Sequence, residues 1–436
     1  MLQYSKQNKS KKRIPAVLIA ALLVLIILIL IVSECFASEM TPCGNPKTSG
    51  PEITAESAIL YSIDLDKNIY EKKINDRHDP YSVTKLMTAY LAAQKLDMDS
   101  KTTISKAAAD DNPNGTTMNL IEGEVVTVEN LMYGVLLLSG NDAAHALAEA
   151  TSGSVDKFVK LMNATAKEWG CKDTHFANPS GWKDSNHYTT AHDLLIIAQK
   201  TLADETVRRI AFSRSYKMPA TNKSEPRKMK SHVTLSKQSD SGVLGGKTGF
   251  WEEDDASVVV EYNKNQLSAI LVLLKDSSKA RTKDAQALFK YAHKATPGFV
   301  VNRKGAQVGH AWIRCAAKTR AATMLDKTVH AYPKKQNASA VRTKIKYRSG
   351  LKAPLKKGTR VGTYTVYVDG KQVASEKLLL AEDSEKGWLP SAIYISNFTT
   401  ICIIVVILLI VLLIMILRMY NIRKRRAGKK RRSMLK

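Results

Sequence analysis

Residues 81–90 read YSVTKLMTAY, and the interpretation of this 436-residue chain works outward from them. Leu86, Met87, Tyr90, Leu91 and Ala92 follow at helical spacing, so we predict a helix over 82–95. Side chains three residues apart lie on one face of a helix, which places the amine of Lys85 beside the hydroxyl of Ser82. A serine hydroxyl becomes a good nucleophile only when a base removes its proton. A lysine can act as that base where burial and a nearby cation lower its pKa.

Two further motifs follow in order, Ser139-Gly140-Asn141 and Lys247-Thr248-Gly249. The first falls in a short break between predicted helices over 127–138 and 142–151, and the second falls in a predicted strand over 243–248. Each motif is weak alone, because such short patterns arise by chance in a chain of this length. In this order and these contexts, they form with Ser82 and Lys85 the signature of the penicillin-recognising serine enzymes. Lys247 would supply the cation that lowers the pKa of Lys85.

The chain here resembles a specific family, the low-molecular-mass penicillin-binding proteins or serine-type D-alanyl-D-alanine carboxypeptidases of peptidase family S11. The likeness extends beyond the three motifs and covers about residues 52–380. It includes LSGNDAA at 138–144, FANPSGW at 176–182, HYTTAHD at 187–193, and Ala353-Pro354 with the following 356–358.

The resemblance implies a catalytic role for four residues. Ser82 attacks the carbonyl of the D-Ala–D-Ala bond at the end of a peptidoglycan stem pentapeptide, and Lys85 takes its proton. Ser139 and Asn141 relay protons and hold the substrate amide. The resulting acyl-enzyme is hydrolysed by water.

The resemblance also implies a substrate-binding strand made of Lys247, Thr248, Gly249 and Phe250. The first two bind the terminal carboxylate, and the backbone N–H groups of Phe250 and Ser82 form the oxyanion hole. No metal and no organic cofactor is required. β-Lactam antibiotics are expected as inhibitors, because they mimic the substrate and acylate the serine.

One segment departs from the family pattern. After Phe250 the family usually continues with small residues and glycine, whereas this chain has the bulky, acidic run WEEDD at 251–255. This difference bears on substrate preference and turnover. The run also has a simple structural interpretation, a solvated turn between two strands.

Strands at 57–66, 69–71, 243–248, 256–262 and 267–274 flank a helical block, and a closing helix is predicted over 282–293. We therefore predict an α+β fold, an antiparallel sheet with a helical block as in β-lactamases and transpeptidases. Alternating stretches at 308–313, 341–347 and 363–368 predict a small all-β domain after it, followed by a C-terminal transmembrane helix. The expected boundaries are a linker over 38–51, a catalytic domain over 52–295, a β domain over 296–380 and a second linker over 381–397.

The net charge of +26 is concentrated at the two ends, which hold 15 of the excess charges. Each basic end adjoins an apolar run, at 14–32 and 398–417, close to the ~20 residues that span a bilayer. Positive flanks remain in the cytoplasm. We therefore expect the catalytic domain on the extracytoplasmic face of the cell membrane and a basic cytoplasmic tail over 418–436. This topology explains the basic ends better than nucleic-acid binding does, and membrane lipid is an expected partner.

Residues 1–37 have two interpretations. A basic start, an apolar stretch and small residues before position 38 fit a cleaved signal peptide. The apolar stretch is longer than usual for such a peptide, which fits an uncleaved N-terminal anchor instead. The five cysteines show no metal-ligand spacing and no disulfide framework, so we expect them to be packing residues.

Two alternative functions remain open at the level of sequence. A class A β-lactamase shares the three motifs but also needs a deacylating glutamate between the second and third. None of the four glutamates in that interval has the E-x-x-x-N context. A catalytically weak or silent cell-wall binding protein is the other alternative, favoured only by the acidic run and the basic tail.

Overall fold

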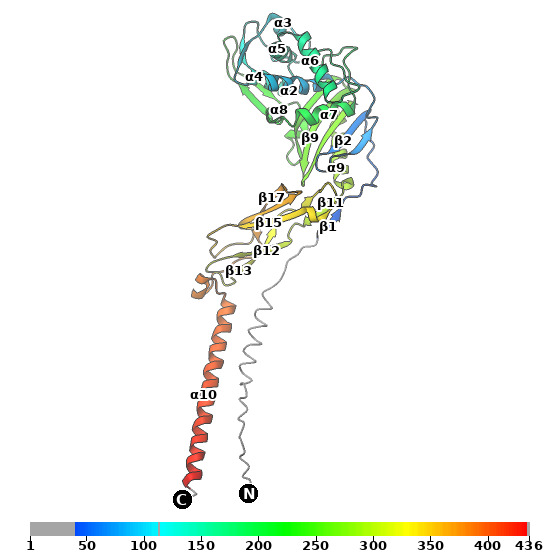
Figure 1. Ribbon diagram of the computed structural model, residues 1–436. Helices are drawn as coiled ribbons and strands as arrows, with labels where there is room; N and C mark the ends of the chain where they lie inside the picture. Colours follow the sequence, from blue (N-terminus) through cyan, green and yellow to red (C-terminus); the bar gives the residue numbers. More distant parts are fainter. Residues whose placement is uncertain (1–39, 112–113, 434–436) are drawn as a thin grey trace, which may run out of the picture.

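The computed structural model describes residues 40–111 and 114–433, with side chains as far as residue 427. The predicted signal peptide or anchor over 1–37 lies outside the described residues. The described chain is elongated and bent (Figure 1), with a first domain of sheet and helices, a β-rich second domain and one long helix in succession. The long helix and the first domain lie at opposite ends of the second domain.

Five antiparallel strands form the central sheet of the first domain in the order β3-β2-β10-β9-β8. Their bounds are β2 (Ser57–Ser62), β3 (Lys67–Lys72), β8 (Val243–Glu252), β9 (Asp255–Lys264) and β10 (Leu267–Asp276). Leu60 of β2 pairs with Leu271 of β10, so the beginning and the end of the domain meet in the middle of the sheet. The segment between β3 and β8 supplies the helical block, which confirms the predicted α+β fold.

Helices cover both faces of this sheet. The helix α9 (Arg281–Ala295) packs on one face, where Leu271 and Leu288 are fully buried. The helical block covers the other face around α2 (Lys85–Lys95) and α5 (Asn141–Ser152), with Leu86 and Leu147 buried between them. The remaining elements of the block are β4 (Lys101–Thr103), α3 (Lys106–Ala109), β5 (Val125–Thr127), α4 (Val128–Tyr133), α6 (Val155–Glu168), α7 (Ala191–Thr201), α8 (Glu205–Ala211), β6 (Ser215–Met218) and β7 (Arg227–Lys230).

Several local features differ from the sequence-based expectations. The helices α6 and α8 were not predicted, although the side chains of Ser154 and Asp204 cap their first turns. The helix expected over 127–138 is α4 followed by a wider π-helical turn, η2 (Gly134–Leu138). The strand expected to end at residue 248 continues as β8 to Glu252, so the acidic run forms the tip of the β8–β9 hairpin.

The second domain contains two antiparallel sheets. The larger sheet has the order β12-β13-β17-β16-β15, and the smaller one has the order β1-β11-β14. The strand β1 lies within residues 38–51, the segment expected as a linker. It is part of the smaller sheet, because Pro42 pairs with Phe299 of β11. The bounds are β1 (Thr41–Cys43), β11 (Gly298–Asn302), β12 (Gln307–Trp312), β13 (Arg320–Leu325), β14 (Val329–Ala331), β15 (Val341–Tyr347), β16 (Arg360–Val368) and β17 (Lys371–Leu380).

Residues 381–397, expected as a second linker, are hydrogen-bonded to the second domain. The backbone N–H of Cys315 donates to the carbonyl of Ser391 at 2.9 Å, and the N–H of Asn397 donates to the carbonyl of Ala317 at 2.9 Å. The side chain of Asn397 accepts from the N–H of Trp388 at 2.9 Å. A short helical turn, η5 (Leu389–Ile393), lies within this segment. The long helix is therefore joined to the second domain through a structured junction.

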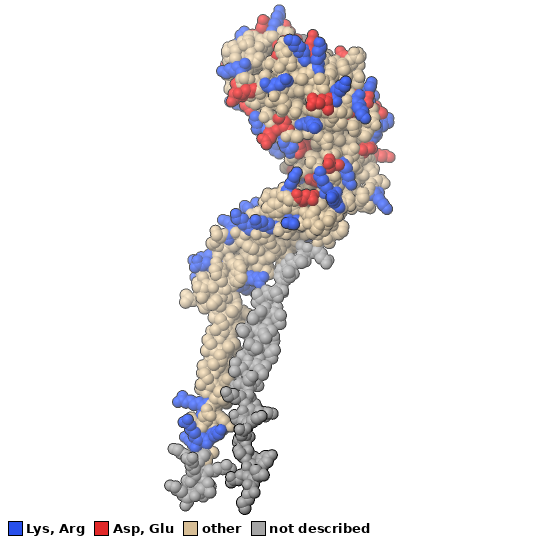
Figure 2. Space-filling model, in the orientation of Figure 1, with Lys and Arg blue, Asp and Glu red and all other residues tan. Residues whose placement is uncertain are grey.

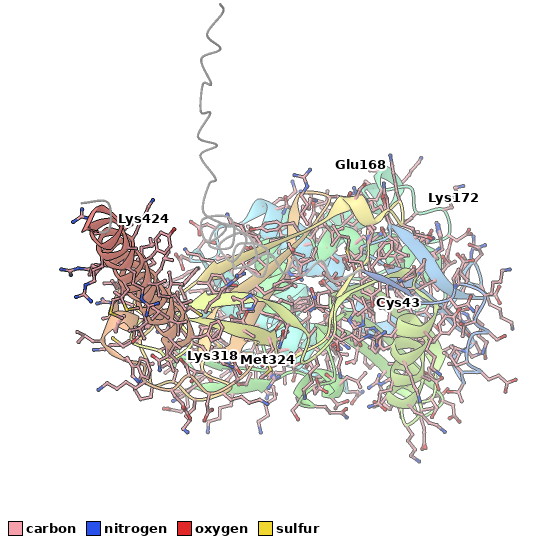
Figure 3. The ribbon with its side chains drawn as sticks, turned by 90° about the horizontal axis from the view of Figure 1, so that it is seen from below. Cys43, Glu168, Lys172, Lys318, Met324 and Lys424 are labelled. Atoms are coloured by element: carbon pink, nitrogen blue, oxygen red, sulfur yellow. The ribbon has the colours of Figure 1, made fainter. Side chains whose placement is uncertain are left out.

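The last helix, α10 (Asn397–Ser433), extends away from the rest of the protein. Its portion Asn397–Ala427 has a mean hydropathy of 3.7 over its most apolar window, and none of that window is buried within the protein. It is long and apolar enough to cross a membrane. Viewed from below, α10 with Lys424 lies at one end of the molecule, and Glu168 and Lys172 lie at the other (Figure 3).

Candidate active site

The serine of the first motif lies in a tight turn that precedes α2. Residues Tyr81–Thr84 form a 3-10 turn, η1, and Tyr81 has a left-handed φ of 50°. The strand β8 passes close by at Gly249, where an added Cβ would lie 2.7 Å from the carbonyl oxygen of Pro80 and 2.2 Å from Ser257 Oγ. Glycine is therefore required at position 249 because the strand carrying the third motif packs directly on the nucleophile turn.

Lys85 is completely buried directly behind Ser82. Its Nζ lies 3.0 Å from Ser82 Oγ, 2.8 Å from Asn141 Oδ1 and 2.6 Å from the carbonyl oxygen of Ser180. Burial lowers the pKa of Lys85 well below its ordinary value, and the charge of Lys247 lowers it further. The structure thus provides both conditions under which a lysine amine becomes a base.

These contacts also orient the lone pair of the neutral amine. The Asn141 and Ser180 oxygens can only accept hydrogen bonds, so they take the two N–H groups of a neutral Lys85. The remaining position on the nitrogen faces Ser82 Oγ. In its neutral form, Lys85 therefore points its lone pair at the serine proton.

The second and third motifs meet through another buried lysine. Lys247 Nζ donates to Ser139 Oγ at 2.9 Å and to the carbonyl of Thr248 at 2.8 Å. Burial lowers the pKa of Lys247 to about 7, and the nearby guanidinium of Arg281 contributes in the same direction. Burial therefore lowers the pKa of both lysines, and each pKa is lowered further by a neighbouring cation, Lys247 for Lys85 and Arg281 for Lys247.

Hydrogen bonds to the loop around residues 116–120 hold the second motif, whose first residue has a left-handed backbone conformation. Ser139 has a left-handed φ of 71°, and the N–H of Asn141 donates to the carbonyl of Thr116 at 2.8 Å. The carboxylate of Asp142 accepts from the N–H groups of Met118 and Leu120 at 2.8 and 3.0 Å. These bonds fix the loop beside the nucleophile, and Thr116 lines the pocket.

His187 is hydrogen-bonded to the nucleophile turn. Its Nδ1 accepts from the backbone N–H of Ala177 at 3.3 Å, so Nε2 carries the proton and donates to Thr84 Oγ1 at 2.9 Å. Burial lowers the pKa of His187 to about 4. The ring is therefore neutral at ordinary pH and acts as a structural donor.

A pocket opens in front of Ser82 and has an aromatic wall. Its lining is formed by Tyr81, Ser82, Asn114, Gly115, Thr116, Asn141, Gly181, Trp182, Phe250 and Trp251. Trp251 stacks on Tyr81 with ring centroids 6.1 Å apart and meets the edge of Trp182 at 5.3 Å. The bulky residue at 251 therefore forms part of the pocket, while the acidic residues that follow it form the hairpin tip.

Of the eight residues predicted from the sequence, Ser82, Asn141 and Phe250 line this pocket, and the other five lie within three residues of one of them along the chain. Ser82, Lys85 and Asn141 are in direct contact, and Lys247 and Ser139 form the second contact. Gly249 and Phe250 continue the same strand, and Phe250 lines the pocket together with Ser82.

Besides Thr116 and Asp142, sequence analysis missed three further contributors. The carbonyl of Ser180 accepts from Lys85, Trp182 forms part of the wall, and Arg281 Nη1 donates to the carbonyl of Gly249 at 3.0 Å. The FANPSGW segment contains Ser180 and Trp182 and was noted only for its resemblance. Arg281 has no local signal, because its hydrogen bond to β8 depends on the tertiary packing of α9 on the sheet.

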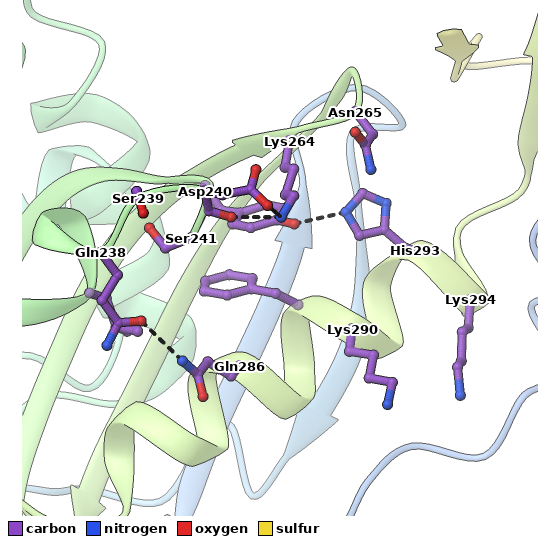
Figure 4. A pocket seen from close by; sticks show the side chains of 13 residues that line it. Gln238, Ser239, Asp240, Ser241, Lys264, Asn265, Gln286, Lys290, His293 and Lys294 are labelled. Carbon is purple, nitrogen blue, oxygen red and sulfur yellow. Dashed lines mark hydrogen bonds and ion pairs between the residues drawn. The ribbon is translucent and has the colours of Figure 1, made fainter. Parts of the chain in front are cut away.

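A second hollow lies between α9 and the loop before β8, on the other side of the sheet (Figure 4). His293 Nε2 lies 2.8 Å from the hydroxyl of Tyr262, and Lys264 pairs with Asp240 at 2.8 Å. Burial lowers the pKa of His293 to about 4. Among its described lining residues, no serine or cysteine contacts a base, so it does not compete as a catalytic site.

The fold and the pocket together define a penicillin-recognising serine peptidase. Residues 45–278, more than half of the chain, match the family model of D-alanyl-D-alanine carboxypeptidases, Peptidase S11. Residues 300–386 match the model of the penicillin-binding protein 5 C-terminal domain. The chain therefore belongs to the S11 family, which confirms the resemblance stated from the sequence.

Individual relatives agree with this assignment. The chain is 29% identical over 347 residues to the D-alanyl-D-alanine carboxypeptidase DacF of Bacillus subtilis, covering 78% of this chain and 88% of that one. It is 32% identical over 257 residues to the D-alanyl-D-alanine carboxypeptidase of Streptomyces strain K15, covering 55% of this chain and 88% of that one. The crystal structure of penicillin-binding protein 5 from Haemophilus influenzae superposes with a TM-score of 0.54 at 26% identity, covering 78% of this chain and all of that chain.

Proposed function

We propose that the protein is a membrane-anchored serine D-alanyl-D-alanine carboxypeptidase that removes the terminal D-Ala from peptidoglycan stem pentapeptides. The observation that carries this proposal is the 3.0 Å approach of Lys85 Nζ to Ser82 Oγ inside a fully buried lysine site. Membership of the S11 family and the names of the relatives support the same reaction.

The proposed first half-reaction is acylation. The neutral amine of Lys85 removes the proton of Ser82 as Oγ attacks the carbonyl carbon of the D-Ala–D-Ala bond. The negative charge that develops on the carbonyl oxygen is stabilised by the backbone N–H groups of Ser82 and Phe250, both of which line the pocket. The proton taken up by Lys85 passes through the hydroxyl of Ser139 to the leaving D-Ala amine. The C–N bond breaks, an ester remains on Ser82, and Lys85 is neutral again.

In the proposed second half-reaction, water hydrolyses this ester. Lys85 again accepts a proton, now from the water, and returns it to Ser82 as the acyl group leaves. Lys247 in its charged form and the hydroxyl of Thr248 bind the terminal carboxylate of the substrate. This recognition explains the preference for a free C-terminus, and β-lactams inhibit because their carboxylate and strained amide occupy the same positions.

The proposed location is the extracytoplasmic face of the cell membrane, with the tail after residue 417 in the cytoplasm. An exposed apolar helix over Asn397–Ala427 supports an anchor, and the basic residues that follow it support this orientation. Membrane lipid is then a direct partner of the helix.

None of the comparisons favours the β-lactamase alternative. The described residues that line the pocket include no glutamate to activate a deacylating water. Glu149, which lies between the second and third motifs, instead accepts from Ser105 Oγ at 2.7 Å and lies 3.4 Å from His145.

Two measurements test the proposal. Fluorescent penicillin should label the full-length protein and the control Ser239→Ala, a change at an exposed serine of the second hollow, but not Ser82→Ala. Mass spectrometry should show loss of a single alanine from a pentapeptide ending in D-Ala-D-Ala. Labelling without loss of alanine would support a silent penicillin-binding protein, and labelling of Ser82→Ala would overturn the assigned nucleophile.

A further inference from the structure

Charge is distributed unevenly between the two domains. Residues 40–297 contain 32 Lys and Arg against 32 Asp and Glu, whereas residues 298–395 contain 19 against 6. The first domain is therefore neutral overall, and the second carries an excess of 13 positive charges. Basic side chains predominate on the face of the second domain that Figure 2 displays. The two basic ends of the chain do not contribute to this excess.

The edge strand β15 carries a regular row of cations. Arg342, Lys344, Lys346 and Arg348 occupy alternate positions in and just after the strand, and all four side chains are exposed. Alternate side chains point to one face of a strand and lie ~7 Å apart, so the row extends over about 20 Å. We call these four residues the β15 row.

No described acidic residue forms an ion pair with the β15 row. The one hydrogen bond from its side chains is a weak donation from Arg348 to the carbonyl of Arg360 at 3.4 Å. The four positive charges are therefore not neutralised within the second domain. Like charges at this spacing repel one another, and a bound polyanion would relieve that repulsion.

The strands beside the row add hydrogen-bond donors. Lys344 lies opposite Thr365, and Lys346 lies opposite Thr363, on β16. The next strand continues these rows with Ser375 opposite Thr365 and Lys377 opposite Thr363. A hydroxyl thus lies behind each of the two central lysines, and these cross-strand rows contain no carboxylate.

The row runs along the length of the second domain. Near its first end, the carbonyl of Ala340, the residue before β15, accepts a hydrogen bond from the backbone N–H of Asp369. Asp369 and Lys334 line one hollow, and Lys334 forms an ion pair with Asp66 of the first domain. At its other end, the N–H of Arg314 donates to Leu351 at 2.9 Å, and its Nε donates to Ala392 of η5 at 3.3 Å. The row therefore leads from the first domain towards the junction with α10.

This direction argues against a bilayer as the partner of the whole row. The junction exposes apolar side chains, with Leu389 91% and Ile393 72% exposed beside the start of α10. Lipid that surrounds α10 would cover these side chains and reach only the Arg348 end of the row. A partner that contacts all four cations has to be extended and to follow the strand.

We propose that the β15 row binds a linear anionic polymer of the cell envelope, one whose backbone carries phosphodiester groups at short intervals. This inference goes beyond the proposed carboxypeptidase activity. Lys and Arg form strong charge-assisted hydrogen bonds with phosphate oxygens, and the threonine hydroxyls donate to the same groups. Release of counterions from the polymer makes such binding strongly dependent on salt.

Binding to this polymer would hold the protein in place in the envelope and would leave the pocket at Ser82 free for substrate. Each of the four contacts is weak alone, and their regular spacing makes them additive along a chain with a comparable repeat. The membrane helix and the polymer would then restrict the same molecule at two points.

Binding of purified poly(glycerol phosphate) to the full-length protein in nanodiscs of neutral lipid tests the proposal. The test variant is Arg342→Gln/Lys344→Gln/Lys346→Gln/Arg348→Gln. The matched control, Lys157→Gln/Lys160→Gln/Lys167→Gln/Lys172→Gln, removes the same charge from exposed positions of the first domain. Labelling by fluorescent penicillin verifies that both variants are folded.

We expect the β15 variant to weaken binding at 50 mM salt at least about 100-fold and the control to weaken it less than about 3-fold. The slope of log K against log salt should fall by roughly 3 in the β15 variant, close to 0.7 per lost phosphate contact. Equal weakening in both variants would show a non-specific charge effect and overturn the proposal. Unchanged polymer binding with a loss of binding to phosphatidylglycerol vesicles or to peptidoglycan would assign the row to those partners instead.

Discussion

Lys247 Nζ and Ser139 Oγ, from the third and second motifs, lie 2.9 Å apart although 108 residues of chain separate them. The contact joins the sheet to the helical block beside the pocket. It also places a cation whose pKa is about 7 next to the hydroxyl that we propose as a proton relay.

Replacement of Lys85 by Gln should remove the base without emptying its position. We expect the rate of acylation by penicillin to fall about 100-fold to 10,000-fold, the range that general bases contribute. Stopped-flow labelling of the purified variant measures this rate. Combination with Ser82→Ala should abolish the residual acylation, because no ester can form without the serine hydroxyl. A Lys85→Gln variant that acylates normally would exclude the amine as the base.

The pH dependence of acylation should reflect Lys247. Its cation is lost as pH rises through a pKa of about 7, so kcat/KM for a carboxylate-bearing substrate should decline above that pH. Lys247→Arg keeps its charge at every accessible pH and should move the decline to higher pH. A pH profile of kcat/KM for both proteins checks this, and a decline at the same pH in both would contradict it.

The neutral ring of His187 should make stability sensitive to acid. Its pKa is about 4 in the folded protein and near 6.5 in the unfolded chain. Between those values the unfolded chain binds more protons, so the contribution of His187 is fully present above pH 6.5 and is lost as pH falls towards 4. We expect a loss of about 2 kcal/mol between pH 7 and pH 5.

The matched comparison for that prediction is His187→Gln, which does not titrate. Urea unfolding of both proteins at the two pH values isolates the His187 contribution from those of other groups. An equal fall in unfolding free energy for the two proteins would show that the ring is not the sensitive group.

Substitution of Gly249 by Ala should separate the nucleophile turn from β8. The new Cβ would lie 2.2 Å from Ser257 Oγ and 2.7 Å from the carbonyl oxygen of Pro80. We expect a destabilisation of about 1–3 kcal/mol from overpacking, together with slower acylation. Thermal unfolding and penicillin labelling measure the two effects. Adding Ser257→Ala should restore only part of the loss, because the Pro80 contact remains.

Trp251 should influence substrate binding more than chemistry. Its ring stacks on Tyr81 and forms the pocket wall with Trp182. We expect Trp251→Ala to raise KM for a pentapeptide about 10-fold and to change kcat less than about 3-fold, since the described contacts of Trp251 with other aromatic rings are with the pocket wall. Steady-state kinetics provide the test, and a fall in kcat with unchanged KM would assign Trp251 a catalytic role.

The sequence predicted which motif residues lie close together better than it predicted the residues around them. Ser82 and Lys85 are neighbours because of local helical geometry, and the other motifs were identifiable through their short patterns and their resemblance to a family. Arg281 and the carbonyl of Ser180 reach the site only through tertiary packing, which leaves no local periodicity to detect.

The same limit applied to the fold. The sheet and its flanking helices follow from alternation and helical spacing, and these were predicted correctly. The pairing of Pro42 with Phe299 was missed, because polar segments of mixed composition give no signal for a strand that adds to a distant sheet edge. The junction at Ser391 was taken for a linker for the same reason, although backbone bonds to Cys315 hold it in place.

The structured junction before α10 has a geometric consequence. Hydrogen bonds join the second domain to the long apolar helix, so the domain cannot move freely as it would on a flexible tether. With the helix in a bilayer, the hydroxyl of Ser82 would stay within a narrow range of distances from the lipid surface as the protein diffuses. Stem peptides within that range would be trimmed, and those nearer to or farther from the lipid surface would escape.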